Sequence, residues 1–186
     1  MKIHIKNMVS IRCQMVVKAK LEELGLEYSY VKLGEANIIG DVQPEQQKQL
    51  EKELKEVGLV LMNNKKSVLV ERVKNIIIEL VHYTDGEIKV NLSDYLSDKL
   101  NYNYTYLANL FSEENGVSIE RFYLNHKIER VNELIIYDEL NISEIAWKMH
   151  YSSVAHLSNQ FKKYTGLTPT QFKGLEIKHR NTLESV

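Results

Sequence analysis

The 186-residue chain has little of three things: it contains one cysteine, two prolines and no long apolar run. The single cysteine, Cys13, cannot form an internal disulfide, which suits a reducing cytoplasm. No apolar run approaches the length that crosses a bilayer, and the start MKIHIKNMVS has no small-residue cleavage site of a secretion signal. We therefore expect a cytoplasmic protein with no membrane partner.

The chain also lacks net charge, because the formal total is only −1. This balance counts against a strong nonspecific nucleic-acid binder. The distribution is uneven, however. Residues 87–144 have five basic and eleven acidic side chains, a balance of −6, whereas residues 145–180 have six basic and one acidic, a balance of +5. A polyanion should therefore prefer the later segment.

Residues 2–62 alternate between short strand-like and helix-like patterns. Strands are expected at 2–6, 28–33, 36–42 and 59–62. One helix contains Met15, Val16 and Ala19 and stops at Gly25; a second, charged helix opens at Pro44 and stops at Gly58. The order is βαββαβ, so the sequence predicts an α+β, ferredoxin-like domain over residues 1–63.

A longer helix is expected at about 67–83, followed by a turn at Asp85-Gly86. The connecting segment 64–86 could join two domains, pack on the first domain or pair with another copy. From residue 92 onward the patterns are helical. They predict an all-α domain over residues 87–175 and a tail over 176–186.

The second half contains an internal repeat with a spacing of fifty residues. NYTYLANLFSEENGVSIERF at 103–122 returns as SVAHLSNQFKKYTGLTPTQF at 153–172. Leucine and phenylalanine four residues apart form one apolar stripe on a helix, and the glycine stands where a left-handed residue ends it. Short helices at 92–100 and 142–149 precede the copies. We therefore predict two helix-turn-helix units, joined by a long linker helix at 118–137.

Residues 92–173 resemble the DNA-binding domain of AraC-type transcription regulators, most closely in ISEIAWKMHYSSVAHLSNQFKKYTGLTPTQFK at 142–173. The resemblance implies a sequence-specific DNA-binding regulator whose two recognition helices read successive major grooves of double-stranded DNA, about one turn apart. The family usually has glycine in the turn where this chain has His150. A positive φ at that position would strain the histidine.

The outward faces of the two recognition helices hold the candidate DNA contacts. By resemblance to the family, the base-contacting positions are Thr105, Ala108, Asn109, Val154, Ala155, Ser158 and Asn159. Asparagine can pair with adenine and valine or alanine can touch a thymine methyl group, while neither face has an arginine for guanine, so we expect an A/T-leaning site. The candidate phosphate contacts are Lys162, Lys163, Lys173 and the helix cap at Thr168.

The N-terminal segment resembles a degenerate heavy-metal-associated domain, in the order of its elements and in MVSIRC at 8–13. That family holds a soft metal such as Cu(I) between two cysteine thiolates. Here Met8 and Cys13 match, but Ser10 replaces the first cysteine, so we predict no metal site. We expect Met8 to pack in the core and Cys13 to cap the loop before the first helix.

Two other functions stay open on the sequence. One is a metal- or thiol-responsive regulator that senses through Cys13; the other is a protein-interaction adaptor whose helix-turn-helix pair has lost DNA binding. The N-terminal domain or the connecting helix could form a homodimer. No nucleophile motif, phosphate loop or carboxylate pair stands in a persuasive context, so we expect no enzyme and no cofactor.

Overall fold

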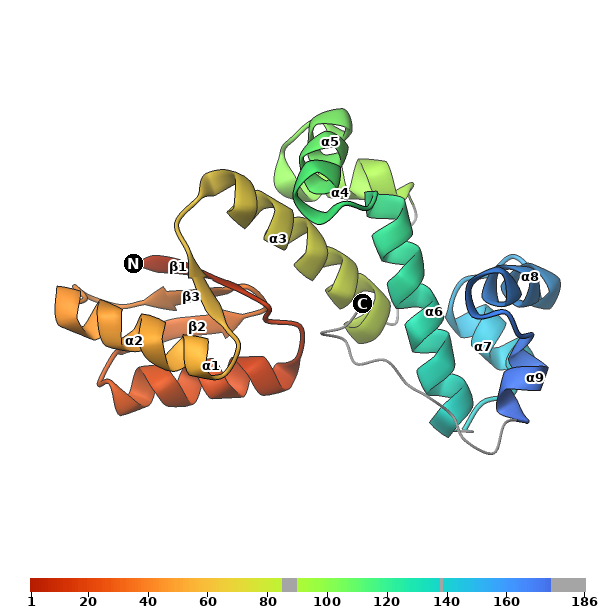
Figure 1. The fold of residues 1–186 in the computed structure, drawn as a ribbon, viewed down its shortest axis with the longest axis horizontal. Coiled ribbons are helices and arrows are strands. Elements are labelled where there is room, and N and C mark those ends of the chain that lie inside the picture. The colour runs from red at the N-terminus through yellow and green to blue at the C-terminus, as the bar shows by residue number, and fades with distance from the viewer. Residues whose placement is uncertain (85–89, 138, 175–186) are drawn as a thin grey trace. The chain divides into compact units, whose positions relative to one another are not determined.

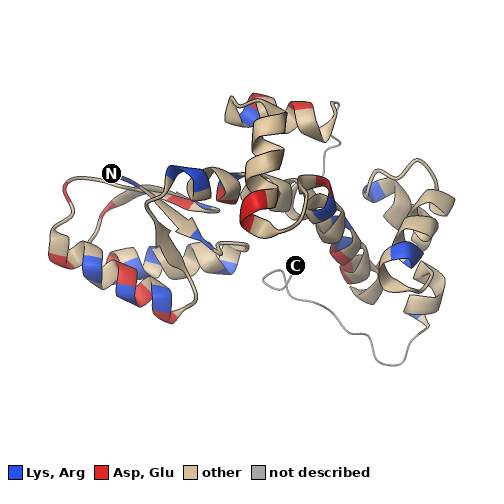
Figure 2. Cartoon of the chain, turned by 45° about the horizontal axis from the view of Figure 1, so that its top comes forward, with Lys and Arg blue, Asp and Glu red and all other residues tan. Residues whose placement is uncertain are grey.

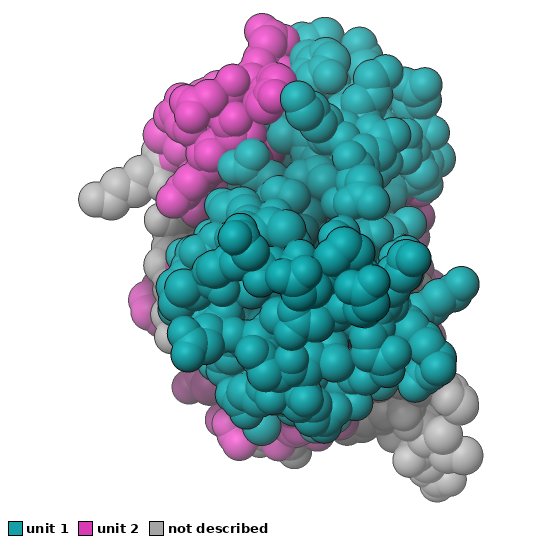
Figure 3. Space-filling view, turned by 90° about the vertical axis from the view of Figure 1, so that its left-hand side faces the viewer, with its two compact units in different colours: residues 1–76, 105–116 teal, residues 77–104, 117–186 magenta. Residues whose placement is uncertain are grey.

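The computed structural model of the chain describes residues 1–84, 90–137 and 139–174. The predicted turn at Asp85-Gly86 and the predicted tail at 176–186 lie outside these residues. The chain forms two compact units (Figure 3). The first contains residues 1–76 and 105–116, and the second contains residues 77–104 and those from 117 onward.

The first unit contains a small antiparallel sheet and two helices in the predicted order βαββαβ (Figure 1). The elements are β1 (Lys2–Lys6), α1 (Ile11–Glu23), β2 (Tyr28–Lys32), β3 (Glu35–Ile38), α2 (Pro44–Glu56) and β4 (Val60–Met62). The strand order is β2-β3-β1-β4, with every neighbouring pair antiparallel. β3 is shorter than its predicted range of 36–42.

The core of this sheet lies on the side of α1 and α2. Successive side chains of a strand point to opposite faces, so alternate strand residues reach the core. Its buried members are Ile3, Ile5, Val31, Ala36 and Ile38 from the strands, Val17 and Leu21 from α1, and Leu50 and Leu54 from α2. Met8 joins them with no exposed surface, as predicted.

Ser10 and Cys13 both make contacts at the start of α1. Ser10 is the residue that caps this helix, because its hydroxyl accepts a hydrogen bond from the backbone N–H of Cys13 at 3.4 Å. The Cys13 thiol also contacts the loop before α1, as predicted, because its Sγ donates to the backbone carbonyl of Asn7 at 3.9 Å. Cys13 lies in the first turn of α1, and its Sγ is 3.3 Å from the Ser10 hydroxyl. Serine is a preferred cap because its side chain satisfies an N–H that the first helical turn leaves open.

The connecting helix has two parts, α3 (Lys65–Ile78) and the π-helical turn η1 (Glu79–Tyr83). Together they match the predicted helix at 67–83. Polar contacts tie α3 to the sheet: Glu71 accepts a hydrogen bond from the backbone N–H of Asn7 at 3.0 Å. Asn75 lies against Gly34 so closely that a Cβ on Gly34 would meet its Nδ2 at 1.9 Å. Gly34 also has a φ of 75°, so this turn needs glycine for two reasons.

The described residues from 90 onward form helices and turns, as the patterns predict. The helices are α4 (Leu92–Leu100), α5 (Tyr104–Asn115), α6 (Ile119–Tyr137), α7 (Ile142–Lys148), α8 (Val154–Thr165) and α9 (Pro169–Lys173). α6 is the predicted linker helix. Within the second unit, α6 packs against η1, α7 and α9, and α8 packs against α7 and α9. No described helix is long and apolar enough to span a bilayer.

The sequence repeat reappears as a repeat of helix caps. Gly116 and Gly166 have left-handed φ values of 70° and 81° and donate to the carbonyls of Ser112 and Lys162, both at 2.9 Å. The helices that follow begin alike. The hydroxyls of Ser118 and Thr168 each accept a backbone N–H, from Arg121 and Gln171 respectively, at 3.2 Å. The two copies therefore end one helix and start the next in the same way.

Candidate nucleic-acid interface

The helix α8 presents the predicted base-contacting side chains of the second copy. Leu157 and Phe161 have no exposed surface and anchor its inner face. Phe161 also packs edge-on against Phe172 of α9, with ring centroids 5.6 Å apart. The opposite face carries Val154, Ala155 and Asn159, all exposed, and Ser158, which is half-buried. The apolar stripe packs α8 onto the rest of the domain, so its opposite face is exposed and can contact a partner.

The turn before α8 determines where that face begins. His150 has a φ of 53°, which puts this histidine in the strained left-handed region. Ser153 then caps α8 by accepting a hydrogen bond from the backbone N–H of His156 at 3.1 Å. Between them, the Tyr151 ring is buried with the Lys127 ammonium 4.2 Å from its centroid. The buried ring and the cap hold the start of α8 in place.

The helix α5 presents the first copy in the same manner. Leu107, Leu110 and Phe111 are buried on its inner face. The three predicted base-contacting residues lie on the outer face: Thr105 and Asn109 are exposed and Ala108 is half-buried. The structure therefore places all seven candidates away from the buried stripes of their helices.

The candidate phosphate contacts cluster where acidic residues are missing. Residues 145–174 contain four lysines and no aspartate or glutamate, as Figure 2 shows for α7, α8 and α9. Lys162, Lys163 and Lys173 are exposed. Thr168 is already engaged: its hydroxyl and its backbone N–H both donate to Oε1 of Gln171, at 3.1 and 2.9 Å. A phosphate at Thr168 would have to displace that oxygen.

A buried polar network in the second unit was not predicted. His82 Nε2 and His126 Nδ1 are 3.3 Å apart, although 44 positions separate them in the chain. Glu133 lies 3.9 Å from His82 Nδ1 and accepts a hydrogen bond from Arg130 at 2.7 Å. Burial, with the nearby His82, lowers the pKa of His126 to about 3. His82 belongs to η1 and the other three to α6, so the network joins the linker helix to a π-helical turn, a feature often found at functional sites.

Trp147 was also missed by the sequence reasoning. It is the single tryptophan of the chain and is 82% exposed on α7. Its position outside the apolar stripe formed by Ile145 and Ala146, which are buried, was the available signal. Large exposed aromatic side chains are uncommon on protein surfaces and are enriched at binding sites.

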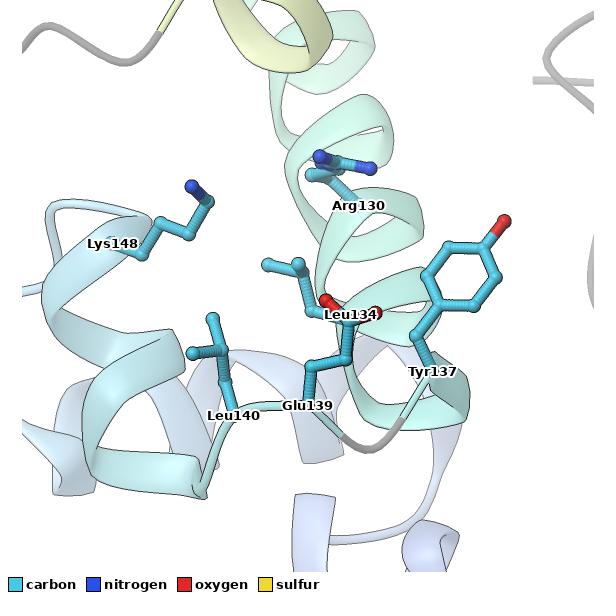
Figure 4. Close-up of a pocket in the computed structure, with 6 residues that line it drawn as sticks. All are labelled: Arg130, Leu134, Tyr137, Glu139, Leu140 and Lys148. Carbon is cyan, nitrogen blue, oxygen red and sulfur yellow. The ribbon is translucent and has the colours of Figure 1, made fainter.

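A pocket of about 420 Å³ lies between the end of α6 and α7 (Figure 4). It is lined by Arg130, Leu134, Tyr137, Glu139, Leu140 and Lys148. Its Arg130 is the same side chain that donates to Glu133 in the buried network. None of the predicted DNA contacts lines this pocket, so it is separate from the candidate interface.

Two residues of the degenerate metal-binding motif, Met8 and Ser10, stabilise the fold of the N-terminal domain. The Met8 side chain is fully buried in the core, and the Ser10 hydroxyl caps α1. Within residues 1–84, 90–137 and 139–174, no group of three or more His, Cys, Asp or Glu side chains is placed to hold a metal ion.

The helix-turn-helix part of the chain is similar to known proteins. Residues 96–174 match the family described as a helix-turn-helix domain. YtdP of Bacillus subtilis, an HTH-type transcriptional regulator, is 26% identical over 101 residues, which are 54% of this chain and 13% of that protein. YesN of Bacillus subtilis, a transcriptional regulatory protein, is 31% identical over 98 residues, which are 52% of this chain and 27% of that protein.

A solved structure shows the same fold. The C-terminal domain of AraT, a response regulator from Geobacillus stearothermophilus, has a TM-score of 0.52 and 25% identity, and the match covers 64% of this chain and 94% of that one. The chain therefore carries a DNA-binding domain of the helix-turn-helix class. Residues 96–174 are of the AraC type of helix-turn-helix domain. The match spans about a quarter or less of the two curated relatives.

Proposed function

We propose that the chain is a sequence-specific, DNA-binding transcription regulator of the cytoplasm that inserts α5 and α8 into successive major grooves of double-stranded DNA. The observation that carries the proposal is the outer face of α8. It combines exposed Val154, Ala155 and Asn159 with Lys162 and Lys163, in a segment without acidic residues. An α-helix fits the major groove, and lysines beside it neutralise phosphates.

Base reading is assigned to side chains that hydrogen-bond or touch methyl groups. Asn159 and Asn109 would pair with adenine, and Val154 and Ala155 would contact thymine methyl groups. Thr105, Ala108 and Ser158 complete the proposed set of base contacts. Because none of these is an arginine, we expect a site that favours A·T pairs at the positions read by α8.

Phosphate contacts are assigned to Lys162, Lys163 and Lys173, with Thr168 contributing only where a phosphate displaces Gln171. Phosphate contacts fix the register of the protein on DNA without reading its sequence. The first copy is less suited to this task, because α4 and α5 contain four acidic residues and one lysine. We therefore assign most of the DNA affinity to the second copy.

The proposed organisation keeps the boundaries drawn from the sequence. Residues 1–63 form a ferredoxin-like domain, residues 64–86 connect it, and residues 87–175 form the DNA-binding domain. A homodimer through the N-terminal domain or the connecting helix is part of this proposal. The βαββαβ order and the β2-β3-β1-β4 sheet support the assignment of the first domain.

The test begins with selection of bound duplexes from a random DNA library, followed by affinity measurements on the best site. A second-copy variant, Lys162→Ser/Lys163→Glu, gives α8 the residues that α5 has at Ser112 and Glu113. It should bind about 10- to 100-fold more weakly at about 0.1 M salt, and the slope of log affinity against log salt should fall by about 2.

The matched control makes the reverse exchange in the first copy, Ser112→Lys/Glu113→Lys, and should bind at least as tightly as the unaltered chain. If selection enriches no sequence and binding shows no salt dependence, the chain is an adaptor and the proposal is wrong. A guanine-dominated core in the selected sites would refute the assigned base contacts of α8.

A further inference from the structure

The charges of residues 1–76 are divided between two sets of elements. α1, α2 and the loops beside them have six basic and eight acidic side chains, a balance of −2. The four strands and α3 have seven basic and two acidic side chains, a balance of +5. Figure 2 shows both signs along α2. The positive charge of this part of the chain is therefore concentrated on its strands and on α3.

The strand lysines share one face of the sheet. Lys2 and Lys6 alternate along β1 with Ile3 and Ile5, which are buried in the core. Lys32 alternates in the same way with Val31 on β2. Side chains alternate across a strand, so all three lysines point away from the α1 and α2 side. Lys6 and Lys32 are exposed, and the Lys2 side chain is 49% exposed.

The two acidic residues of this region are already engaged. Glu35 accepts hydrogen bonds from Lys2 at 3.2 Å and from the Tyr30 hydroxyl at 3.1 Å. Glu71 accepts the backbone N–H of Asn7 and lies 3.6 Å from Lys74. Their charges therefore offset Lys2 and Lys74, while Lys6 and Lys32 add to the net positive charge of the face.

The helix α3 adds basic side chains next to the sheet, because it begins three positions after β4 ends at Met62. The pKa of His4 on β1 is lowered, mainly by burial. The negative charge of Glu35 raises this pKa, and the positive charges of Lys2 and Arg72 lower it further. Arg72 is next in sequence to Glu71, whose carboxylate accepts the backbone N–H of Asn7 directly after β1. Lys65 and Lys66 lie in the first turn of α3, directly after β4, and both are exposed, as is Arg72. We define the basic sheet surface as Lys2, Lys6, Lys32, Lys65, Lys66 and Arg72.

We propose that the basic sheet surface contacts phosphate groups of double-stranded DNA and adds sequence-independent affinity to the helix-turn-helix domain; this inference rests on the proposed function. Lysine binds phosphate as a point charge and needs no pocket. Single-stranded nucleic acid is usually held by several stacked aromatic rings. On this face Tyr30 is placed between Lys2 and Lys32, whose ammonium groups lie 5.9 and 5.2 Å from its ring centroid. This arrangement favours the charged backbone of a duplex over a stacking platform.

The test measures the affinity of the full chain for a labelled nonspecific duplex of about 30 base pairs over a range of salt concentrations. The variant Lys6→Gln/Lys32→Gln/Lys66→Gln removes three charges from the surface. The matched control, Lys18→Gln/Lys48→Gln/Lys52→Gln, removes three exposed charges from α1 and α2. The slope of log affinity against log salt should fall by about 0.9 for each phosphate that the surface variant no longer neutralises, and should stay unchanged in the control.

Equal slopes for the surface variant, the control and the unaltered chain would overturn the inference, provided that thermal melting shows the variant to be folded. The Lys162→Ser/Lys163→Glu variant separates this failure from failure of the proposed function, because it should still bind more weakly. If the unaltered chain has no salt-dependent affinity for DNA, both proposals fail. If the surface variant bound only single-stranded DNA of the same length more weakly, and duplex DNA as tightly as before, the inference that the surface contacts duplex DNA would also be wrong.

Discussion

The helices α5 and α8 each span twelve residues, end before a left-handed glycine and bury a leucine and a phenylalanine four residues apart. Their outer faces differ, because α8 has Lys162 and Lys163 where α5 has Ser112 and Glu113. The residues that pack and cap are thus alike in the two copies, whereas the charged residues that face solvent are not. The same pattern of buried and capping residues therefore supports two helix surfaces of opposite charge.

The turns that lead into these helices differ as well. The left-handed residue is Asn101 in the first copy, with a φ of 57°, and His150 in the second, with a φ of 53°. Asn101 stands three positions before the first residue of α5, while His150 stands four positions before the first residue of α8. The second turn has five residues between its helices (149–153), the first has three (101–103), and the second uses a residue type that tolerates the left-handed conformation less readily.

Truncation of the buried rings should disturb the two copies most and to a similar degree. Phe111→Ala and Phe161→Ala each remove a ring that has no exposed surface. Each should lower the free energy of unfolding by about 3–5 kcal/mol, because the apolar burial of the ring disappears and a cavity remains. Urea unfolding followed by circular dichroism measures both, with the exposed Tyr106→Ala as control. If either alanine variant lowered the free energy of unfolding by less than about 1 kcal/mol, the two phenylalanines would not contribute equally to stability.

Acid should act on the second unit through His126, which is 1% exposed. Its pKa is lowered to about 3 from an ordinary 6.5, so the folded state binds fewer protons than the unfolded state. The stability it contributes is therefore complete above about pH 6.5 and is lost as pH falls toward about 3. Between about pH 7.5 and pH 5 the loss should be about 2 kcal/mol.

Urea unfolding at both pH values checks this expectation. His126→Gln should flatten the pH dependence, and the exposed His150→Gln should leave it unchanged. An unaltered slope in His126→Gln would show that other groups cause the acid sensitivity.

The smallest effect should come from the two left-handed turn residues. His150→Gly relieves a strained φ and should raise the free energy of unfolding by about 0.5–1 kcal/mol. Asn101→Gly should give a smaller gain, because asparagine occupies the left-handed region more readily. Urea midpoints of the two variants, measured side by side, test the order. A decrease in stability in His150→Gly would mean that its side chain makes interactions worth more than the strain.

Local patterns predicted most of the fold because local chemistry determines it. Alternation at Lys2–Lys6, the proline at the start of α2 and the repeated Gly116 and Gly166 each specify an element by themselves. The cap at Ser10 agrees with the ordinary preference of serine for a helix start.

Contacts across the chain could not be predicted in this way. The meeting of His82 and His126 depends on how η1 packs against α6, and no spacing in the sequence encodes it. The same holds for Gly34, whose close contact with Asn75 exists only once α3 lies at the end of the sheet. For the candidate interface, helical periodicity was enough to find the outward faces, but the engagement of Thr168 by Gln171 required the structure.

The exposure of Trp147 has a spectroscopic consequence. Since 82% of the only tryptophan is already in contact with solvent, its emission in the native protein should be close to that of the denatured chain. Tryptophan fluorescence will then be nearly silent during unfolding. The same indole becomes a selective optical probe of α7, because any macromolecule that covers this helix should shift its emission to shorter wavelength or quench it.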